Sequence, residues 1–135
     1  MINPAEHDSG KLILRLTIGG LLLLPGISKL IKGIDGLVEL HESKGIPAIM
    51  AYGVYVGEVL APLFLIIGFR ARIAALLVAF TMFWAIIVRH AADVFKLTES
   101  GAWGVELPAL FLLGAVAIYF LGAGRYALSG SNRWD

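Results

Sequence analysis

The stretch KLILRLTIGGLLLLPGISKL, residues 11–30, decides the fold class of this chain. It carries only three charged side chains, and its length matches the roughly 20 apolar residues that an α-helix needs to cross a bilayer. Further apolar stretches of spanning length follow at about residues 47–68, 71–90 and 105–122. The sequence therefore predicts an all-α polytopic membrane protein, in which a single domain, residues 1–135, forms a bundle of four transmembrane helices.

The composition agrees with a membrane protein and excludes several other classes. Of the 135 residues, 59% are hydrophobic and 16% are charged, against roughly a quarter charged in an ordinary globular domain. The mean hydropathy is +0.84. Because the 11 basic and 10 acidic residues nearly balance, we expect no surface for nucleic acid. The absence of cysteine excludes disulfides, thiol nucleophiles, iron–sulfur clusters and thiolate zinc sites.

The segments between the spans indicate how the helices are connected. Residues 69–72 (FRAR) form a tight turn, so the second and third helices should be antiparallel neighbours. Residues 31–46 are spaced as an amphipathic surface helix, and residues 91–104 resemble an interfacial loop. An even number of spans places both termini on one side, and the basic Arg70 and Arg72 favour the cytoplasm for that side. The first apolar stretch is too long for a signal-peptide core, so we expect it to remain in the mature protein.

Ionisable side chains within the spans are the candidate functional residues, because a charge inside a bilayer is costly without a partner. Glu58 lies near the middle of the second span, and Arg15 lies about one turn into the first. We expect these two residues to form an ion pair inside the bundle, with Tyr52 and Tyr55 close by. A second polar cluster is expected at the membrane level opposite the termini. Its members would be Glu106, Lys29, Arg89 and His90.

These charges are open to more than one interpretation. They can be structural and fix how the helices pack, or they can form a site that binds the polar head of a lipid-soluble molecule or relays protons. A third alternative is that they bind a partner. The histidines lack the paired arrangement that holds haem or metal in helix bundles, and His7 and His41 are expected in solvated segments. No metal site is therefore expected. The sequence also lacks a serine-triad motif, a phosphate loop and a dinucleotide fingerprint, so no catalytic residue is assigned.

Small residues and prolines predict close packing and bends. Gly53, Gly57 and Ala61 form a stripe on the second span that allows another helix to approach, within the chain or from a second copy. Gly19 and Gly20 are expected to serve the same purpose in the first span, where the dipeptide Pro25-Gly26 predicts a kink.

Taken together, these residues resemble the DoxX family of small four-helix membrane proteins over nearly the whole chain. The elements that carry the resemblance are Leu14-Arg15-Leu16, Pro25-Gly26 followed by Lys29, Gly57-Glu58, residues 67–72 (IGFRAR), His90, Glu106 and residues 122–128 (GAGRYAL). The resemblance implies the four-helix fold and an inner-membrane location. The family takes its name from a subunit associated with quinol and thiosulfate oxidation, and its members are linked to membrane redox and oxidative-stress systems.

The resemblance and the buried charges lead to one functional hypothesis. We expect an accessory protein of quinone-linked or oxidative-stress redox systems, with a polar pocket that binds a quinone-like ligand or a redox partner subunit. The residues expected to line this pocket are Arg15, Glu58, Glu106, Lys29, His90, Tyr52 and Tyr55. No covalent cofactor is expected, and a homo-oligomer is plausible. The alternative is a non-enzymatic membrane scaffold or a small-molecule transporter.

Overall fold

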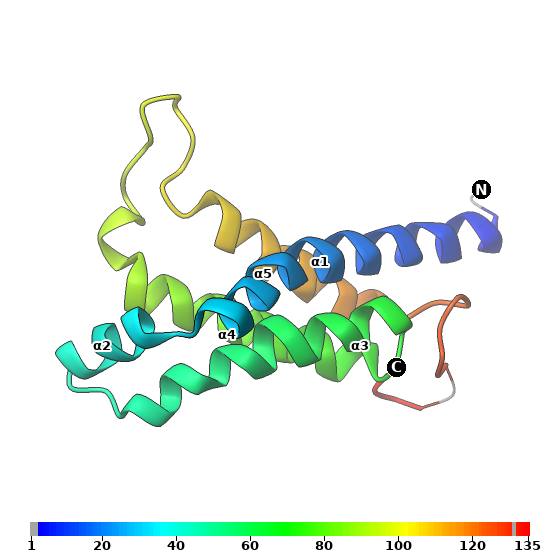
Figure 1. Cartoon of the computed structure of the whole chain (residues 1–135). Helices are drawn as coiled ribbons and strands as arrows, with labels where there is room; N and C mark the ends of the chain where they lie inside the picture. Colours follow the sequence, from blue (N-terminus) through cyan, green and yellow to red (C-terminus); the bar gives the residue numbers. More distant parts are fainter. Residues whose placement is uncertain (1–2, 131) are drawn as a thin grey trace.

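The computed structural model describes residues 3–130 and 132–135, and these form a helical bundle (Figure 1). Within these residues the structure contains no strand, apart from an isolated bridge between Leu97 and Trp103. The helices are α1 (Pro4–Lys32), α2 (Asp35–Ser43), η1 (Ala48–Gly53), η2 (Val56–Leu60), α3 (Ala61–Ile67), α4 (Ala71–Arg89), η3 (Ala91–Asp93) and α5 (Glu106–Leu121). The segments η1, η2 and α3 together make the second span. The predicted all-α membrane bundle is confirmed.

The helix bounds agree with the sequence prediction except at the start of the chain. Helix α1 begins at Pro4, seven residues before the predicted span, because Asn3 and Glu6 form a reciprocal capping box there. Helices α1 and α4 and the second span have the length and apolarity needed to cross a membrane, whereas α5 has only 16 residues. The predicted amphipathic helix is present as α2, and it lies at the end of the bundle remote from both termini (Figure 1).

The second span changes its helix type along its length. It begins as the 3₁₀-helix η1, continues as the π-helix η2 and ends as the α-helix α3. In η2 the wider turn is closed by the bond from Ala61 N–H to the carbonyl of Val56. Pro62 has no N–H to offer the carbonyl of Glu58 four residues earlier, so a regular α-helix is not available at this point. Single-turn π segments of this kind are frequent at functional sites.

Small residues let the helices approach closely, and this prediction holds for Gly19 and Gly57. A β-carbon at Gly19 would meet the carbonyl of Pro62, and one at Gly57 would overlap the side chain of Thr81. Gly20 and Gly53, in contrast, have open space around them. Alanines line the contact between α4 and α5, and a hydrophobic core joins all four spans. Its buried members include Ile18, Leu22, Leu65, Ala74, Ala75, Val78, Ala115 and Ile118.

The C-terminal segment, residues 122–130 and 132–135, folds back over the bundle end that carries the 69–72 turn. Ala123 N–H donates to the main-chain oxygen of Asp135, and Arg72 N–H donates to the carbonyl of Trp134. The Asp135 carboxylate accepts hydrogen bonds from the Ser129 hydroxyl at 2.6 Å and from the Asn132 N–H at 2.7 Å, and it pairs with Arg70 at 3.1 Å. We call this end of the molecule the terminal side, and the opposite end the α2 side.

Candidate functional site

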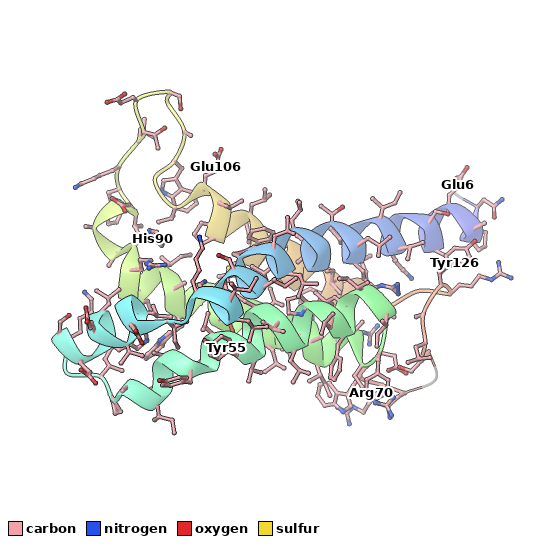
Figure 2. The ribbon with its side chains drawn as sticks, in the orientation of Figure 1. Glu6, Tyr55, Arg70, His90, Glu106 and Tyr126 are labelled. Carbon is pink, nitrogen blue, oxygen red and sulfur yellow. The ribbon has the colours of Figure 1, made fainter. Side chains whose placement is uncertain are left out.

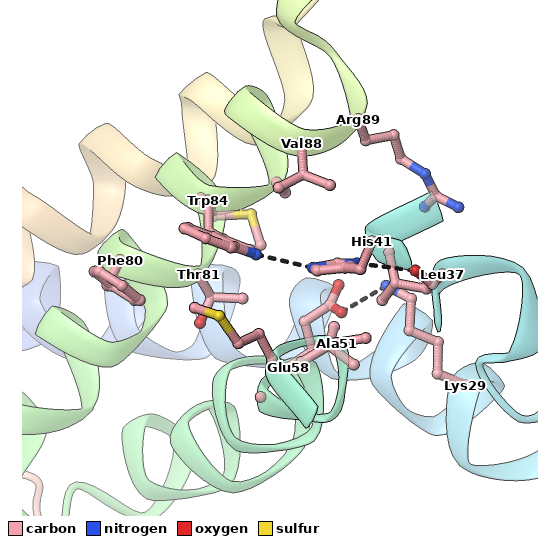
Figure 3. A pocket seen from close by; sticks show the side chains of 15 residues that line it. Lys29, Leu37, His41, Ala51, Glu58, Phe80, Thr81, Trp84, Val88 and Arg89 are labelled. Carbon is pink, nitrogen blue, oxygen red and sulfur yellow. Dashed lines mark hydrogen bonds and ion pairs between the residues drawn. The ribbon is translucent and has the colours of Figure 1, made fainter. Parts of the chain in front are cut away.

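A cavity of about 170 Å³ lies in the half of the bundle nearest the α2 side (Figure 3). It is enclosed by the end of α1, by α2, by the first half of the second span and by the second half of α4. Its lining residues are Lys29, Leu37, His41, Met50, Ala51, Gly53, Val54, Glu58, Phe80, Thr81, Met82, Trp84, Ala85, Val88 and Arg89. Most of the lining is apolar, and the polar groups belong to a few side chains.

An ion pair forms the main polar feature of the cavity. The Nζ of Lys29 lies 2.5 Å from Oε2 of Glu58, and the two side chains are 25% and 7% exposed. Both partners reach the cavity because Gly26, on α1, packs directly against the main-chain carbonyl of Glu58. Lys29 follows Gly26 by three residues and therefore lies on the same face of α1. The pair thus places a cationic donor beside an anionic acceptor.

This pairing corrects the expected Arg15–Glu58 ion pair, which is wrong. The guanidinium of Arg15 is buried, with 1% exposure, and it donates to the carbonyls of Ala123 and Tyr126 at 2.8–3.0 Å. It also lies against Gly68, at the end of α3. These accepting carbonyls belong to the C-terminal segment that follows α5, and hydrogen bonds from a charged donor are strong, so main-chain carbonyls stabilise Arg15 without a carboxylate. Arg15 therefore ties the C-terminal segment to α1 and lies outside the cavity.

A buried histidine closes the cavity toward α2. His41 is 2% exposed, its Nδ1 lies 2.8 Å from the carbonyl of Leu37, and its Nε2 lies 3.0 Å from the indole nitrogen of Trp84 (Figure 3). A carbonyl only accepts and an indole N–H only donates. This pattern assigns His41 as the neutral imidazole with its proton on Nδ1. The hydrogen bond to Trp84 ties α2 to α4.

The expectation that His41 lies in a solvated segment is therefore wrong. His41 follows Leu37 by four residues on an amphipathic helix, so it shares the apolar face of that helix. That spacing was the available signal for its burial, although nothing in the sequence names Trp84 as its partner.

Aromatic rings form one wall of the cavity and reach its mouth. The rings of Phe80 and Trp84 are stacked with centroids 6.4 Å apart, and those of Trp84 and His41 with centroids 6.2 Å apart. Phe80 is 65% exposed in the middle of α4, and Met50 and Gly53 are exposed on η1. The cavity therefore opens sideways between α4 and η1, at a depth where the bundle surface faces lipid.

The remaining predicted site residues do not line the cavity with Glu58. The Tyr55 hydroxyl donates to the carbonyl of Lys29 at 3.3 Å, so it joins the second span to α1. Tyr52 is exposed and its ring lies 6.3 Å from that of Tyr55. Glu106 is exposed at the start of α5, and His90 approaches Asp93 with 3.7 Å between Nδ1 and Oδ2 (Figure 2).

The second polar cluster, expected from Glu106, Lys29, Arg89 and His90, is accordingly not assembled. Lys29 turns to Glu58 instead, and within the described part of the chain Glu106 makes no ion pair. Arg89 contributes to the cavity rim. The predicted pocket residues did not include His41, Trp84 or Thr81. His41 and Trp84 become neighbours only when α2 packs on α4, and Thr81 meets Gly57 only when the second span packs on α4.

Comparison with known families identifies this architecture. The family model described as DoxX matches residues 10–91, which is more than half of the chain. The chain belongs to the DoxX family. The matched part runs from the start of the first span to the end of α4, and all residues that line the cavity of this DoxX protein lie within it.

One relative supports the assignment. The chain is 29% identical over 123 residues to a protein of Bacillus subtilis (strain 168) named "Putative oxidoreductase CatD". The aligned region covers 91% of this chain and 87% of that protein. No solved structure matches the chain.

Proposed function

We propose that this DoxX-family membrane protein binds the head group of a quinone-like ligand in the cavity between η1 and α4, as an accessory of a quinone-linked redox system. The observation that carries the proposal is the Lys29–Glu58 pair within a largely apolar cavity that opens toward lipid. Ligand sites are typically apolar with a few placed polar groups. The name of the Bacillus relative, "Putative oxidoreductase CatD", points in the same direction.

The polar groups suit both redox states of such a ligand. Quinone oxygens only accept hydrogen bonds, and the ammonium of Lys29 can donate one. Quinol hydroxyls donate, and the carboxylate of Glu58 can accept from them. The ring can pack against Trp84, while an apolar tail leaves the cavity past Phe80 and Met50. Because the chain has no cysteine, the electrons would pass between the bound ligand and a redox partner subunit.

Location and assembly belong to the same proposal. The protein would lie in the inner membrane with both termini in the cytoplasm, because Arg70 and Arg72 lie on the terminal side. The space beside Gly57 is filled by the side chain of Thr81 from the same chain, so a homo-oligomer would have to use other surfaces. The surface around Gly20, where a β-carbon would meet no atom within 4 Å, is one such surface.

The absence of native cysteines allows a direct test of ligand binding. Gly53→Cys places one thiol at the cavity mouth, where a β-carbon meets no atom within 4 Å. Its reaction with a maleimide is measured in mild detergent, with and without a fully substituted benzoquinone that carries one ten-carbon tail. Full substitution leaves no free ring carbon to which the thiol could add. At a ligand concentration about ten times Kd we expect the labelling rate to fall about tenfold, because the fraction of free sites is 1/(1 + [L]/Kd).

The matched control is Gly36→Cys on α2. Position 36 also has open space but does not line the cavity, so its labelling should not respond to the quinone. Equal protection of both thiols, or of neither, would contradict the proposal. In intact cells an impermeant maleimide should label Gly36→Cys from outside, since the α2 side faces away from the cytoplasm in the proposed orientation.

A second experiment separates the redox proposal from the scaffold alternative. The wild-type protein and Glu58→Gln are purified in mild detergent, and the molecules that accompany each are identified by mass spectrometry. We expect a quinone with the wild type that is lost or strongly reduced in Glu58→Gln. If both stable proteins carry phospholipid alone, the scaffold function is favoured.

A further inference from the structure

We infer that α2 is an acid-sensitive lid over the cavity, held closed by the hydrogen bond between His41 and Trp84 and released when His41 takes up a proton. The lid would give the cavity a second opening, toward water on the α2 side, besides its mouth toward lipid. It operates whatever ligand the cavity binds, because it depends only on side chains of the protein itself.

A single buried side chain attaches α2 to α4. Of the nine residues of α2, only His41 is buried, and its Nε2 accepts the indole N–H of Trp84 across the cavity lining (Figure 3). Within the described part of the chain, no other hydrogen bond joins α2 to another helix. Val88, one turn beyond Trp84 on α4, also lines the cavity and is 3% exposed. The His41–Trp84 bond therefore holds α2 over this part of the lining.

Glycines in the left-handed region of the backbone flank α2 on both sides. Gly33 precedes the helix with a φ of 80°, and Gly45 follows it with a φ of 74°. A β-carbon at either position would meet no atom within 4 Å, so no packed neighbour opposes rotation of the main chain there. Segments with few buried contacts open locally at a low cost in free energy. Helix α2 can therefore move away from α4 while α1 stays in place.

A proton on the Nε2 of His41 is incompatible with the closed position. In that position Nδ1 donates to the carbonyl of Leu37, and Nε2 accepts from Trp84. A protonated imidazole has two donors and no acceptor. Its Nε2–H would therefore point at the indole N–H, and the bond that joins α2 to α4 would be lost.

The charges around His41 do not compensate for this loss. Lys29, Glu58 and Arg89 line the same cavity, but Glu58 is already paired with Lys29, and η1 contributes only the exposed Tyr52. In the described residues His41 takes part in no ion pair. The carboxylates of α2 itself are exposed, and they are Asp35, Glu39 and Glu42. These carboxylates and the negative end of the α2 dipole move with the helix, so they do not favour the closed position.

Acid therefore favours the open position. An open lid exposes the imidazole to water, where it takes up a proton at about pH 6.5, whereas the closed lid holds the neutral ring. A ligand that binds one of two states shifts the equilibrium toward that state, and the proton is such a ligand here. The ratio of open to closed molecules should rise about thirtyfold between pH 8 and pH 5.

The test measures how often α2 uncovers position 88. Val88→Cys in the full-length protein introduces the only thiol of the chain, and its reaction with an anionic, water-soluble maleimide is followed at pH 8 and pH 5 in mild detergent. Gly36→Cys, at an exposed position of α2, corrects for the pH dependence of thiol reactivity. We expect the labelling rate of Val88→Cys, divided by that of Gly36→Cys, to be about thirtyfold higher at pH 5 than at pH 8.

Histidine variants identify the group that responds to acid. His41→Gln keeps an acceptor for the Trp84 N–H but takes up no proton in this pH range, so in this background the rate ratio should be the same at pH 5 and pH 8. His7→Gln and His90→Gln are the matched controls and should keep the acid response.

Three outcomes would overturn the lid: a rate ratio that does not change with pH, an acid response that persists in His41→Gln, and an acid response that is lost in His7→Gln or His90→Gln. If His41→Gln does not fold, Trp84→Phe removes the donor of the bond instead. It should raise the rate ratio severalfold already at pH 8, and an unchanged ratio would overturn the lid as well. Quinone binding is not measured in this experiment, so the proposed function stands or fails separately.

Discussion

Gly26 of α1 lies against the main-chain carbonyl of Glu58, so closely that a β-carbon at position 26 would overlap the carbonyl oxygen. This contact fixes where α1 crosses the second span. It also brings Lys29, three residues further along α1, within reach of the Glu58 carboxylate. The geometry of the cavity therefore depends on a residue that has no side chain.

Adding a methyl group at this crossing tests the contact. Gly26→Ala should lower the free energy of unfolding by about 1–3 kcal/mol, the usual cost of overpacking, because the main chain of Glu58 cannot move aside. The measurement is thermal unfolding in detergent, followed by tryptophan fluorescence. The control is Gly20→Ala on the same helix, where open space and the better helix propensity of alanine predict a small gain.

The contact between Gly57 and Thr81 offers a rescue experiment. Gly57→Ala alone should destabilise the protein because the new methyl group meets the Thr81 side chain. Thr81→Gly removes all the obstructing atoms, including the β-carbon that an alanine would keep, so Gly57→Ala should cost much less stability in the Thr81→Gly background than in the wild type. If Gly57→Ala costs the same in both backgrounds in the same unfolding assay, this helix contact is not as described.

The Lys29–Glu58 ion pair predicts coupling between two substitutions. Lys29→Met leaves the nearly buried Glu58 without a cation and should cost about 1–3 kcal/mol, less than the 3–5 kcal/mol of a fully buried pair because Lys29 is partly exposed. Glu58→Gln added to Lys29→Met should restore part of this loss. Additive effects of the two substitutions in a double-mutant cycle would show that the side chains do not interact.

Arg15 predicts a local effect on the C-terminal segment. Arg15→Lys keeps the charge but loses the forked geometry that reaches the carbonyls of Ala123 and Tyr126. We expect faster hydrogen exchange and faster proteolysis of residues 122–130, with the cavity unaffected. Unchanged quinone protection of Gly53→Cys in this background is the matching control, since Arg15 lies outside the cavity.

Asp135 predicts how this segment responds to acid. The hydrogen bond from Ser129, followed by the N–H of Asn132 and the charge of Arg70, lowers the pKa of the Asp135 carboxyl below its usual value. Its contribution to stability is therefore present above the unfolded-state pKa of about 3.9 and is lost as the pH falls through the folded-state pKa. The protection factors of the C-terminal amides, which correct for the intrinsic pH dependence of hydrogen exchange, should fall in that acidic range. Asp135→Asn should show low protection factors already at neutral pH, with little further change in acid.

The sequence predicted the architecture well because the bilayer imposes it. Residues 71–90 and 105–122 correspond to α4 and α5 within one or two residues, since the apolar length of a span and the charges at its ends are visible in the chain. The amphipathic pattern of residues 31–46 likewise predicted α2. The early start of α1 could have been predicted from Asn3 and Glu6, whose capping box is a recognisable sequence signal.

The site was predicted only in part, because side-chain partners depend on how each helix is rotated about its axis. Glu58 and Lys29 were both singled out, but depth along the spans favoured Arg15 as the partner of Glu58. Neighbouring positions on a helix differ by about 100°, so depth alone cannot select a partner. In the structure, the close contact between Gly26 and the Glu58 carbonyl fixes the rotation of α1 about its axis and so turns Lys29 toward Glu58. Packing of α2 on α4 places His41 beside Trp84.

The short α5 has a consequence for the surrounding lipid. Its 16 residues extend over about 24 Å at 1.5 Å per residue, against a hydrocarbon thickness of about 30 Å. The much longer α1 can tilt until its length across the membrane matches that thickness, but α5 is too short to do so. A bilayer accommodates a short helix by local thinning, among other responses, and we expect the bilayer to be thinner beside α5 than beside α1.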